Sequence, residues 1–344
     1  MTSGETSEWD LIEWICQQPQ HFPPSLIKNI GDDCAVFEPQ TKSLSVTTDL
    51  LVEDEHFQRG WISPYFLGRK ALSVNLSDLA AMGALPYATL LALALPAELK
   101  ERYFRSFVRG YLEEASLFQA PLVGGDLSHS RKICIGVTAW GGHEDDEPIW
   151  RSAARPGDST ILIGDVGFSR LGLEILRNED TSEIAELSSE KALSAWAGSS
   201  FRNRCLRAHL MPRALVEVGN WLCRNRLVHA MIDVSDGLAA DLLHIASQSQ
   251  LQAEIQIEKL PIPEKGVYQI DPLEAALNGG EDYALLCTAS TQQLKLLTST
   301  YPPDFPSFQV IGTLIEGKPA LYVCTQGRSE KYQPKGFDHF KCNK

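Results

Sequence analysis

Seven aspartates occur in clusters close to Gly, Ser and Thr residues, and several of them stand where a short apolar stretch ends. They are Asp32, Asp33, Asp49, Asp78, Asp126, Asp233 and Asp236. Carboxylates do not gather in a folded protein unless another group neutralises them, and a metal ion is the usual answer. No set of His and Cys residues accompanies these oxygen ligands, so Mg²⁺ suits them better than zinc. A helix cap or a turn explains any one of them equally well, but it is the weaker account of all seven.

The stretch MIDVSDGLAAD, residues 231–241, holds the last two of these aspartates, with Ser235 between them. An apolar run before it predicts a strand, and Leu238, Leu242 and Ile245 share one helical face after it. The pattern therefore predicts a strand, a tight turn and the start of a helix. Ser235 is the expected N-cap of that helix, because its side-chain oxygen can accept from an early backbone N–H.

Other residues are candidates for ligand contacts, and each also has an ordinary structural explanation. The pairs Gly124-Gly125 and Gly279-Gly280 allow a ligand to approach the backbone, although such pairs are also common in turns. Arg151 could bind phosphate or lie on the surface. The remaining candidates are His56 for a substrate, Glu281 for a polar or cationic group, and Phe337 for stacking on a ring.

The elements that must position these residues differ between the two halves of the chain. In the first half, residues 44–48 and 87–95 predict strands, while residues 64–82 and 98–118 predict helices. Asn75 and Asp78 lie at positions i and i+3, on one face of the first of these helices. A polar, turn-rich segment over 141–158 indicates a boundary, which gives domains 1–150 and 151–344.

In the second half, residues 160–164, 251–257, 284–288, 308–315 and 321–324 predict strands, and residues 168–177 and 212–225 predict helices. Residues 178–200 are rich in Glu and Ser and predict an exposed insertion. Strands and helices alternate irregularly, which favours a two-domain α/β or α+β protein. Neither a G-x-G-x-x-G turn after the first strand nor a P-loop motif is present.

Composition excludes several classes of protein. The chain has 344 residues and a formal net charge of −13, without the basic face of a non-specific nucleic-acid binder. Its eight cysteines include no C-x-x-C pair, which favours a reducing compartment. The longest strongly apolar run, residues 88–96, is too short to span a membrane. The polar, acidic start does not resemble a signal peptide, so we expect a cytoplasmic protein without a membrane or nucleic-acid partner.

Eight motifs occur in the order found in the thiamine-monophosphate kinase family, which the chain closely resembles from about Ile30 to Phe340. They are GDDCAVF, TTDLLVEDEHF, KALSVNLSDLAAMGALP, VGGD, RSAARPGD, IDVSDGL, GGEDYAL and KGFDHF. The family belongs to the superfamily of aminoimidazole ribonucleotide synthetase and selenophosphate synthetase. The resemblance implies two α/β domains and a homodimer in which the N-terminal sheets of two subunits form a β-barrel.

The resemblance also implies an activity: direct, in-line, Mg²⁺-dependent transfer of the γ-phosphate of ATP to thiamine monophosphate, giving thiamine diphosphate. It places several Mg²⁺ ions on Asp33, Thr47, Thr48, Asp49, Asp78, Asp126, Asp233 and Asp236. It assigns ATP contacts to Gly125, Asp126, Arg151 and Ser235, and catalytic roles to Asp236, Arg151 and Asp126. It assigns thiamine monophosphate contacts to His56, Glu281 and Phe337, where relatives carry Tyr or Trp at the last position.

Two alternatives differ from this expectation. One is another ATP-using enzyme of the superfamily. A selenophosphate synthetase usually carries a Cys or selenocysteine and a Lys in a Gly-rich N-terminal loop, whereas Cys16 lies in an amphipathic helical pattern here. The other is a non-catalytic scaffold that binds a nucleotide or a metal. Such a scaffold would be expected to have lost several of the aspartates, and all of them are present.

Overall fold

The computed structural model describes residues 8–30, 34–38, 41–99, 101–143, 147–187 and 200–335. The chain divides into two compact units. Unit 1 comprises Met1–Leu79, Pro86–Asp145 and Thr181–Ala197, and unit 2 comprises Ala80–Leu85, Asp146–Asp180 and Gly198–Lys344. Among the described helices, none combines the length and the hydrophobicity of a membrane-spanning segment.

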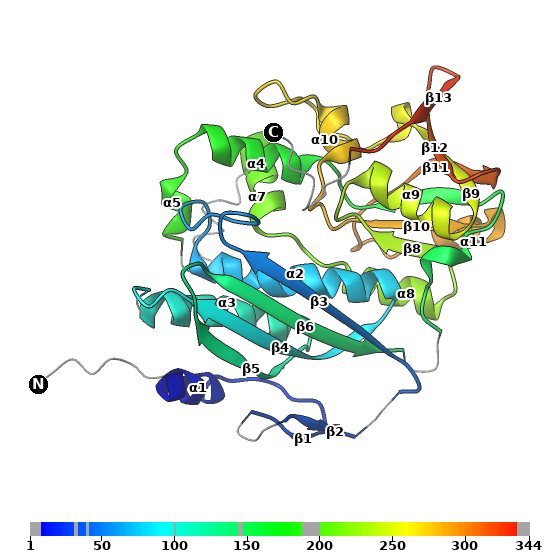
Figure 1. The fold of residues 1–344 in the computed structure, drawn as a ribbon. Helices are drawn as coiled ribbons and strands as arrows, with labels where there is room; N and C mark the ends of the chain where they lie inside the picture. The colour runs from blue at the N-terminus through cyan, green and yellow to red at the C-terminus, as the bar shows by residue number, and fades with distance from the viewer. Residues whose placement is uncertain are drawn as a thin grey trace, which may run out of the picture. The chain divides into compact units, whose positions relative to one another are not determined.

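Unit 1 is built on a four-stranded sheet with the order β3-β6-β4-β5 (Figure 1). The strands are β3 (Leu44–Val52), β6 (Cys134–Gly142), β4 (Leu85–Leu95) and β5 (Leu122–His129). β3 pairs antiparallel with β6, and β4 pairs parallel with β5. Ile135, Val137 and Ala139 of β6 are buried, whereas the residues between them are partly exposed. This alternation places one face of the sheet in the core of unit 1.

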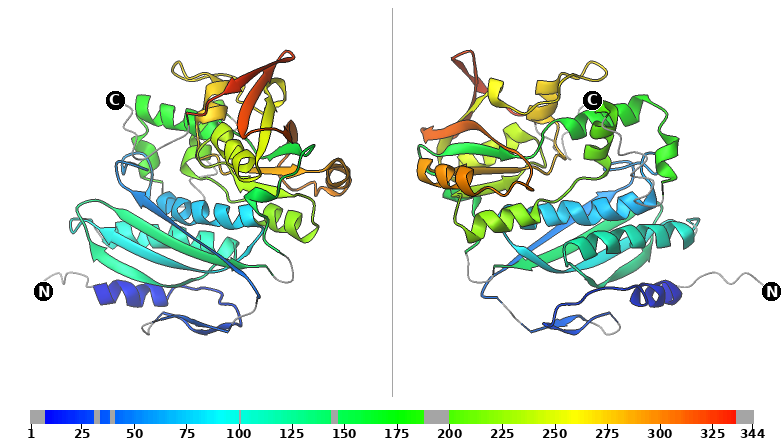
Figure 2. Two further views of the ribbon diagram at one scale, coloured as in Figure 1. Left: turned by 45° about the vertical axis from the view of Figure 1, so that its right-hand side comes forward. Right: turned by 180° about the vertical axis from the view of Figure 1, so that it is seen from behind.

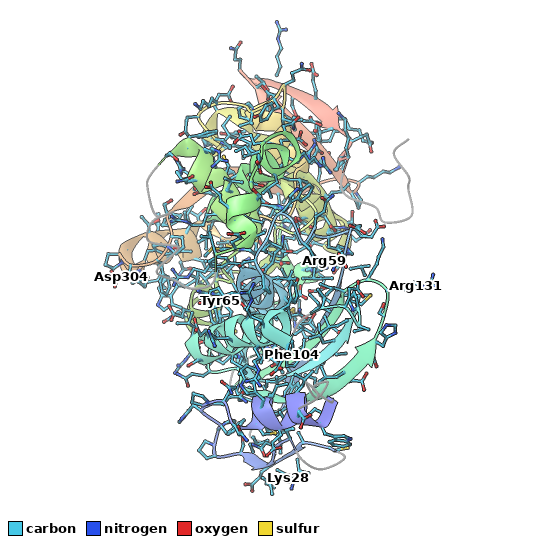
Figure 3. The ribbon with its side chains drawn as sticks, turned by 90° about the vertical axis from the view of Figure 1, so that its left-hand side faces the viewer. Lys28, Arg59, Tyr65, Phe104, Arg131 and Asp304 are labelled. Atoms are coloured by element: carbon cyan, nitrogen blue, oxygen red, sulfur yellow. The ribbon has the colours of Figure 1, made fainter. Side chains whose placement is uncertain are left out.

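Two helices, α2 (Pro64–Met82) and α3 (Glu101–Leu117), cover that buried face (Figures 1 and 2). Figure 3 labels one core aromatic side chain from each helix, Tyr65 and Phe104. Gly68 and Gly110 let the two backbones approach closely. A Cβ atom would lie 2.1 Å from the Phe107 carbonyl oxygen at Gly68, and 1.9 Å from the Tyr65 carbonyl oxygen at Gly110.

The opposite face of this sheet carries exposed apolar side chains. Leu44, Val46 and Leu50 of β3 are 56%, 64% and 57% exposed. A short two-stranded sheet, β1 (Leu26–Lys28) with β2 (Val36–Phe37), follows helix α1 (Glu8–Cys16). Phe37 packs edge-on against Trp140 of β6 with ring centroids 5.5 Å apart. In the described part of the chain, β3 and β5 are the two edges of the four-stranded sheet, so this sheet does not close into a barrel.

Unit 2 contains a seven-stranded sheet with the order β13-β12-β9-β11-β7-β10-β8. In chain order these are β7 (Ser159–Ile163), β8 (Ala230–Asp233), β9 (Leu251–Gln256), β10 (Leu285–Ala289), β11 (Phe308–Glu316), β12 (Ala320–Thr325) and β13 (Arg328–Tyr332). β9 and β12 pair in parallel, and the other pairs are antiparallel.

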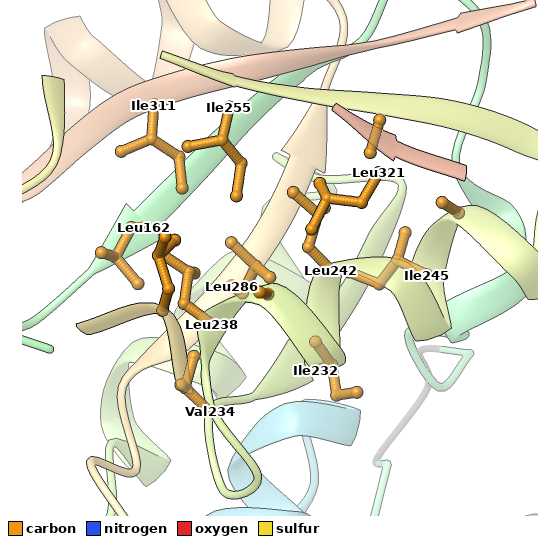
Figure 4. Packing of buried hydrophobic residues seen from close by; sticks show 14 of the residues in the cluster. Leu162, Ile232, Val234, Leu238, Leu242, Ile245, Ile255, Leu286, Ile311 and Leu321 are labelled. Carbon is orange, nitrogen blue, oxygen red and sulfur yellow. The ribbon is translucent and has the colours of Figure 1, made fainter. Parts of the chain in front are cut away.

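Helix α9 (Leu238–Gln248) packs on this sheet. Its Leu238, Leu242 and Ile245 are fully buried among side chains of the strands, including Leu286 and Ile311 (Figure 4). The other helical elements of unit 2 are η1 (Arg151–Ala153), α4 (Phe168–Asn178), α7 (Phe201–Leu210), α8 (Val216–Arg224), η2 (Ile257–Lys259), α10 (Pro272–Asn278) and α11 (Thr291–Thr300). Apolar spacing along α9 thus fixes the element that follows the Asp233–Asp236 loop.

Most expected elements are confirmed, and two expectations are wrong. The helix over 64–82 and the strand over 87–95 are present as α2 and β4. Ser235 is not an N-cap: the N-cap of α9 is Gly237, and no side chain caps it. Residues 178–200 are not wholly an exposed insertion, because α5 (Ser182–Ala185) buries Ile184. Residues 188–199 lie outside the described part.

Candidate functional site

In unit 1, β3 and α2 bring two of the predicted carboxylates together. Asn75 is buried and accepts a hydrogen bond from the Asp49 amide at 3.0 Å, while the Thr47 hydroxyl donates to the Asp78 carboxylate. Burial, and then repulsion from Asp78, raises the pKa of Asp49 to about 6. Thr47 and Asp49 point to the same side of β3, because strand residues two apart share a face. Binding of a cation by Asp49 and Asp78 stays a prediction.

Two other predicted ligands lie on the opposite face of this sheet. The Thr48 hydroxyl donates to the Val137 carbonyl at 3.0 Å and accepts from Thr138 at 3.1 Å. Asp126 lies beside the exposed Ala92 of the neighbouring strand β4, and its carboxylate accepts a hydrogen bond from the Ser128 hydroxyl at 2.8 Å. β5 and β3 are the two edge strands, so they lie about 14 Å apart across three strand spacings. Within unit 1, the Thr48 side chain therefore lies on the opposite face of β3 from the Asp49 side chain, and Asp126 lies on the far edge strand.

Gly125 supports the prediction of close backbone approach, but toward protein. A Cβ atom there would lie 2.0 Å from the Leu91 carbonyl oxygen of the neighbouring strand. Any side chain would force β5 away from β4 and displace Asp126. The requirement for glycine at this position is therefore explained by strand packing, and its contact with ATP stays a prediction.

The turn after β3 determines which ring nitrogen of His56 accepts a hydrogen bond. Its Nδ1 accepts a hydrogen bond from the Val52 amide at 3.0 Å. The neutral ring therefore carries its hydrogen on Nε2, which makes that nitrogen a donor. The buried Glu53 fixes the same turn, because it accepts from the Ile133 amide at 2.9 Å and pairs with Arg59. Contact of His56 with the substrate stays a prediction.

In unit 2, the loop after β8 carries the other two predicted metal ligands. Asp233 is buried at the end of β8, and Asp236 is half-buried in the loop. The Ser235 carbonyl accepts from the Glu281 amide at 2.8 Å, and the Val234 carbonyl accepts from the Tyr283 amide at 2.8 Å. Gly280 has a φ of +71°, and a Cβ atom there would lie 2.6 Å from the Ser235 carbonyl oxygen. Backbone hydrogen bonds thus hold the motifs IDVSDGL and GGEDYAL together within unit 2.

Asp241, in the first turn of α9, is a third carboxylate at this loop that the sequence analysis did not select. It is buried and accepts a hydrogen bond from the Asp236 amide at 3.2 Å. Burial, and then repulsion from Asp233 and Asp236, raises its pKa to about 8, while Arg151 acts in the opposite direction. Its position five residues after Asp236, on the helix that buries Leu238 and Leu242, is the signal that could have identified it.

Arg151 therefore lies in the electrostatic environment of these carboxylates. It begins the short helix η1, and its carbonyl accepts from the Ser249 hydroxyl at 3.1 Å. In unit 2, Arg151, Asp233 and Asp236 thus act electrostatically on the same carboxylate, Asp241, and the Glu281 amide is bonded to the Ser235 carbonyl. Binding of a cation and a phosphate by this set stays a prediction.

Glu281 and Asp282 lie next to this loop and are both anchored to neighbouring helices. The Nδ1 atom of His209, on α7, lies 3.2 Å from the Glu281 carboxylate. The Asp282 carboxylate accepts from the amides of Gly167 and Ser169, at 2.7 and 3.1 Å, where α4 begins. His209 and Asp282 were not selected from the sequence, since neither has a partner nearby along the chain.

Replacing Asp282 by Asn should flatten the dependence of stability on pH between about 4 and 7. Burial, followed by repulsion from Asp165 and Glu281, raises the pKa of Asp282 from 3.8 to about 7. The folded state therefore holds this proton more tightly, and its stability falls as pH rises through that window. Between pH 4 and 8, we expect the free energy of unfolding of the wild type to fall by roughly 1–3 kcal/mol relative to that of Asp282→Asn.

Urea unfolding at each pH measures this difference. Asp304→Asn is the matched control, because Asp304 is exposed in unit 2 (Figure 3). Parallel stability curves for wild type and Asp282→Asn would contradict the assignment.

Two predicted site residues, Asp33 and Phe337, lie outside the described residues, as does Asp32. Within the described ranges, no group of three or more His, Cys, Asp and Glu side chains has an arrangement that could hold a metal ion. The predicted ligands divide between unit 1 and unit 2. Their assignment as one Mg²⁺ set stays a prediction.

Comparison with known families gives matches over both halves of the chain. Residues 31–142 match the family model "AIR synthase related protein, N-terminal domain". Residues 155–324 match "AIR synthase related protein, C-terminal domain".

Curated relatives with similar sequences extend over the whole chain. A thiamine-monophosphate kinase of Aquifex aeolicus is 36% identical over 345 residues, covering 99% of this chain and 100% of that protein. A thiamine-monophosphate kinase of Bacillus subtilis is 33% identical, with 97% and 99% covered.

Solved structures agree with these relatives. A thiamine-monophosphate kinase from Stenotrophomonas maltophilia matches with a TM-score of 0.74 and 31% identity, covering 93% of this chain and 96% of that one. The structure described as "AaThiL complexed with AMPPCP and TMP" matches with a TM-score of 0.71 and 34% identity, covering 99% of both chains. A hydrogenase maturation protein HypE in complex with ATP has a TM-score of 0.70 at 19% identity, which supports the fold alone.

Proposed function

This chain belongs to the thiamine-monophosphate kinases of the AIR synthase related family, and from this premise we propose that it phosphorylates thiamine monophosphate with ATP. The observation that carries the proposal is a similarity over 99% of both chains to the structure described with AMPPCP, an ATP analogue, and TMP. The loop of unit 2 supports it, because Asp233, Asp236 and Arg151 act on one carboxylate, Asp241, and the Glu281 amide is bonded to the Ser235 carbonyl of the same loop.

The proposed reaction is direct, in-line transfer of the γ-phosphate to a phosphate oxygen of the substrate, which gives thiamine diphosphate. That oxygen is already ionised near neutral pH, so no strong general base is required. Phosphoryl transfer depends on positioning and on charge stabilisation rather than on a protein nucleophile. Arg151 would stabilise the oxygens of the transferring phosphate, with Gly125, Asp126 and Ser235 contacting ATP and Asp126 and Asp236 acting at the reacting groups.

We propose that Mg²⁺ ions bind to the aspartate clusters of both units. Carboxylate oxygens are the ligand type that this ion takes, and neighbouring carboxylates repel each other in both units: Asp49 and Asp78 in unit 1, and Asp233 and Asp236 with Asp241 in unit 2. Bound Mg²⁺ would supply Lewis-acid stabilisation of phosphate oxygens. The carboxylates would hold the ions, and Arg151 would hold phosphate beside them.

For the thiamine monophosphate end, we propose contacts from His56, Glu281 and Phe337. The substrate carries a cationic thiazolium ring, which a carboxylate attracts. Glu281 is 31% exposed at its side chain, so it is accessible to a ligand while being held by His209. The Lys335 amide donates a hydrogen bond to the Asn278 side chain at 2.9 Å. Asn278 is three residues before Glu281 in the sequence, and Lys335 is two residues before Phe337.

Replacing Phe337 by Ala should raise the KM for thiamine monophosphate by about 10-fold, because stacking of an aromatic ring is worth on the order of 1 kcal/mol or more. The kcat at saturating substrate should change little. Steady-state kinetics with each substrate varied in turn measures this. Phe337→Tyr serves as the control, since it keeps the ring, and an unchanged KM in Phe337→Ala would remove Phe337 from the substrate site.

A coupled assay on the purified full-length chain tests the function itself. It follows ADP release and thiamine diphosphate formation from ATP, Mg²⁺ and thiamine monophosphate. Stoichiometric formation of both products is the expected result. Binding of Mg-ATP without thiamine diphosphate formation would contradict the proposal and would favour another ATP-using enzyme of the superfamily or a non-catalytic scaffold.

We propose that the chain forms a homodimer through the sheet of unit 1. The exposed apolar face with Leu44, Val46 and Leu50 supports this, as do β3 and β5, which are the edge strands of the sheet in the described part of the chain. A second copy offers the same apolar face and matching edges. Two such sheets could then complete one barrel, as the family resemblance implies.

Replacing Val46 by Glu should convert the dimer into a monomer of 38.1 kDa. The side chain is 64% exposed in the single chain, so a charge there is tolerated in the monomer but would be buried in the dimer. Analytical ultracentrifugation measures the mass. Leu296→Glu is the control, since Leu296 is 50% exposed on α11 of unit 2. A wild-type mass near that of one chain would contradict the proposal.

A further inference from the structure

Glu281 is held in place by a group of buried polar residues that the proposed reaction does not use. His209 is the central member, with 6% of its side chain exposed. Its Nδ1 lies 3.2 Å from Oε2 of Glu281 and 3.1 Å from Oγ of the buried Ser169. A carboxylate only accepts hydrogen bonds, so a hydrogen bond to Glu281 requires the hydrogen on Nδ1, and the Ser169 hydroxyl then lies beside the same N–H as a second acceptor.

The position of His209 is itself fixed by close packing of α4 on α7. Gly172 of α4 lies against α7, where a Cβ atom would be 2.2 Å from the Cys205 carbonyl oxygen and 3.0 Å from the Cβ of His209. Ser169, on the same helix, donates its amide to Asp282 at 3.1 Å. The start of α4 and the end of α7 therefore anchor two consecutive residues, Glu281 and Asp282.

The backbone of Glu281 is fixed independently of His209. Its amide donates to the Ser235 carbonyl at 2.8 Å, and its φ is +55°. The backbone thus joins Glu281 to the loop that carries Asp236, while the side chain meets His209. A long carboxylate side chain with one end fixed still has several rotamers, and a donor at its tip selects one of them.

We propose that His209 is a positioning residue that fixes the Glu281 carboxylate in the orientation that binds the cationic ring of thiamine monophosphate. The proposal rests on the proposed function and deepens it. His209 itself need not contact the substrate. Its loss should therefore affect binding of thiamine monophosphate and leave ATP binding and the transfer step nearly unchanged.

The test compares His209→Leu, which removes the donor, with His209→Asn, whose amide nitrogen can take the place of Nδ1. In the coupled assay we expect His209→Leu to raise the KM for thiamine monophosphate about 10-fold, the effect of one hydrogen bond to a charged group. The kcat and the KM for ATP should stay within about twofold. His209→Asn should recover most of the loss, and His21→Leu, at an exposed histidine of unit 1, is the control.

A double-mutant cycle with Glu281→Ala, which removes the acceptor, separates positioning from a general structural role. If His209 acts through Glu281, the KM of the double variant His209→Leu, Glu281→Ala should equal that of Glu281→Ala alone. An unchanged KM in His209→Leu, additive effects in the cycle, or an equal loss of kcat and ATP binding would each overturn the proposal. Wild-type protein that makes no thiamine diphosphate would instead overturn the proposed function, and with it the substrate role of Glu281.

Discussion

Asp236→Asn is expected to lower kcat on the order of 10³-fold at saturating Mg²⁺ and to leave the protein folded. Asn has the size of Asp but lacks the charge that would hold a metal ion beside the transferring phosphate. The backbone of the loop should survive, because the residue 236 amide still donates to Asp241 and Gly237 still caps α9.

Stability should not fall in this variant. Repulsion from Asp236 contributes to the raised pKa of Asp241, so removing one charge relieves the cluster. The thermal unfolding midpoint of the metal-free protein should equal or exceed that of wild type. Asp304→Asn, in the same unit, should match wild type in both measurements. Near wild-type kcat in Asp236→Asn would remove this loop from the catalytic site.

Gly280→Ala is expected to lower kcat/KM for thiamine monophosphate about 100-fold and to cost roughly 1–3 kcal/mol of stability. The added Cβ would lie 2.6 Å from the Ser235 carbonyl oxygen, so it must push the loop and the Glu281 segment apart. The hydrogen bond from the Glu281 amide to that carbonyl, 2.8 Å long, would break. The loop that carries Asp236 and the segment that carries Glu281 would then shift relative to each other.

Gly327→Ala separates this clash from backbone strain. Gly327 has a φ of +77°, close to the +71° of Gly280, but a Cβ atom there meets nothing within 4 Å. Both variants pay the left-handed strain of a side chain, about 1 kcal/mol, and only Gly280→Ala adds the collision. Steady-state kinetics and urea unfolding of the two variants measure the difference. Equal stability losses together with normal activity in Gly280→Ala would show that the loop adapts.

Local pattern was sufficient to predict the elements that carry the site. Helix α2 follows from the spacing of Leu72, Leu76 and Leu79, and β4 follows from its continuous apolar run. The start of α9 was predicted less well. Ser235 has the side chain of an N-cap, but its carbonyl is occupied by the Glu281 amide and the helix begins after Gly237. A contact from 46 residues away along the chain overrides that local preference.

Residue type and motif order by themselves determined the family, the aspartates and the substrate candidates, because these are properties of local sequence. Only the tertiary structure decided which of them meet. It joins Asp49 to Asn75 and Asp78, places Asp126 across the sheet, and adds Asp241 to the loop of Asp236. It also places His209 beside Glu281, which is 72 positions later in the chain. Such contacts depend on how strands pair and helices pack, and residue spacing along the chain does not record them.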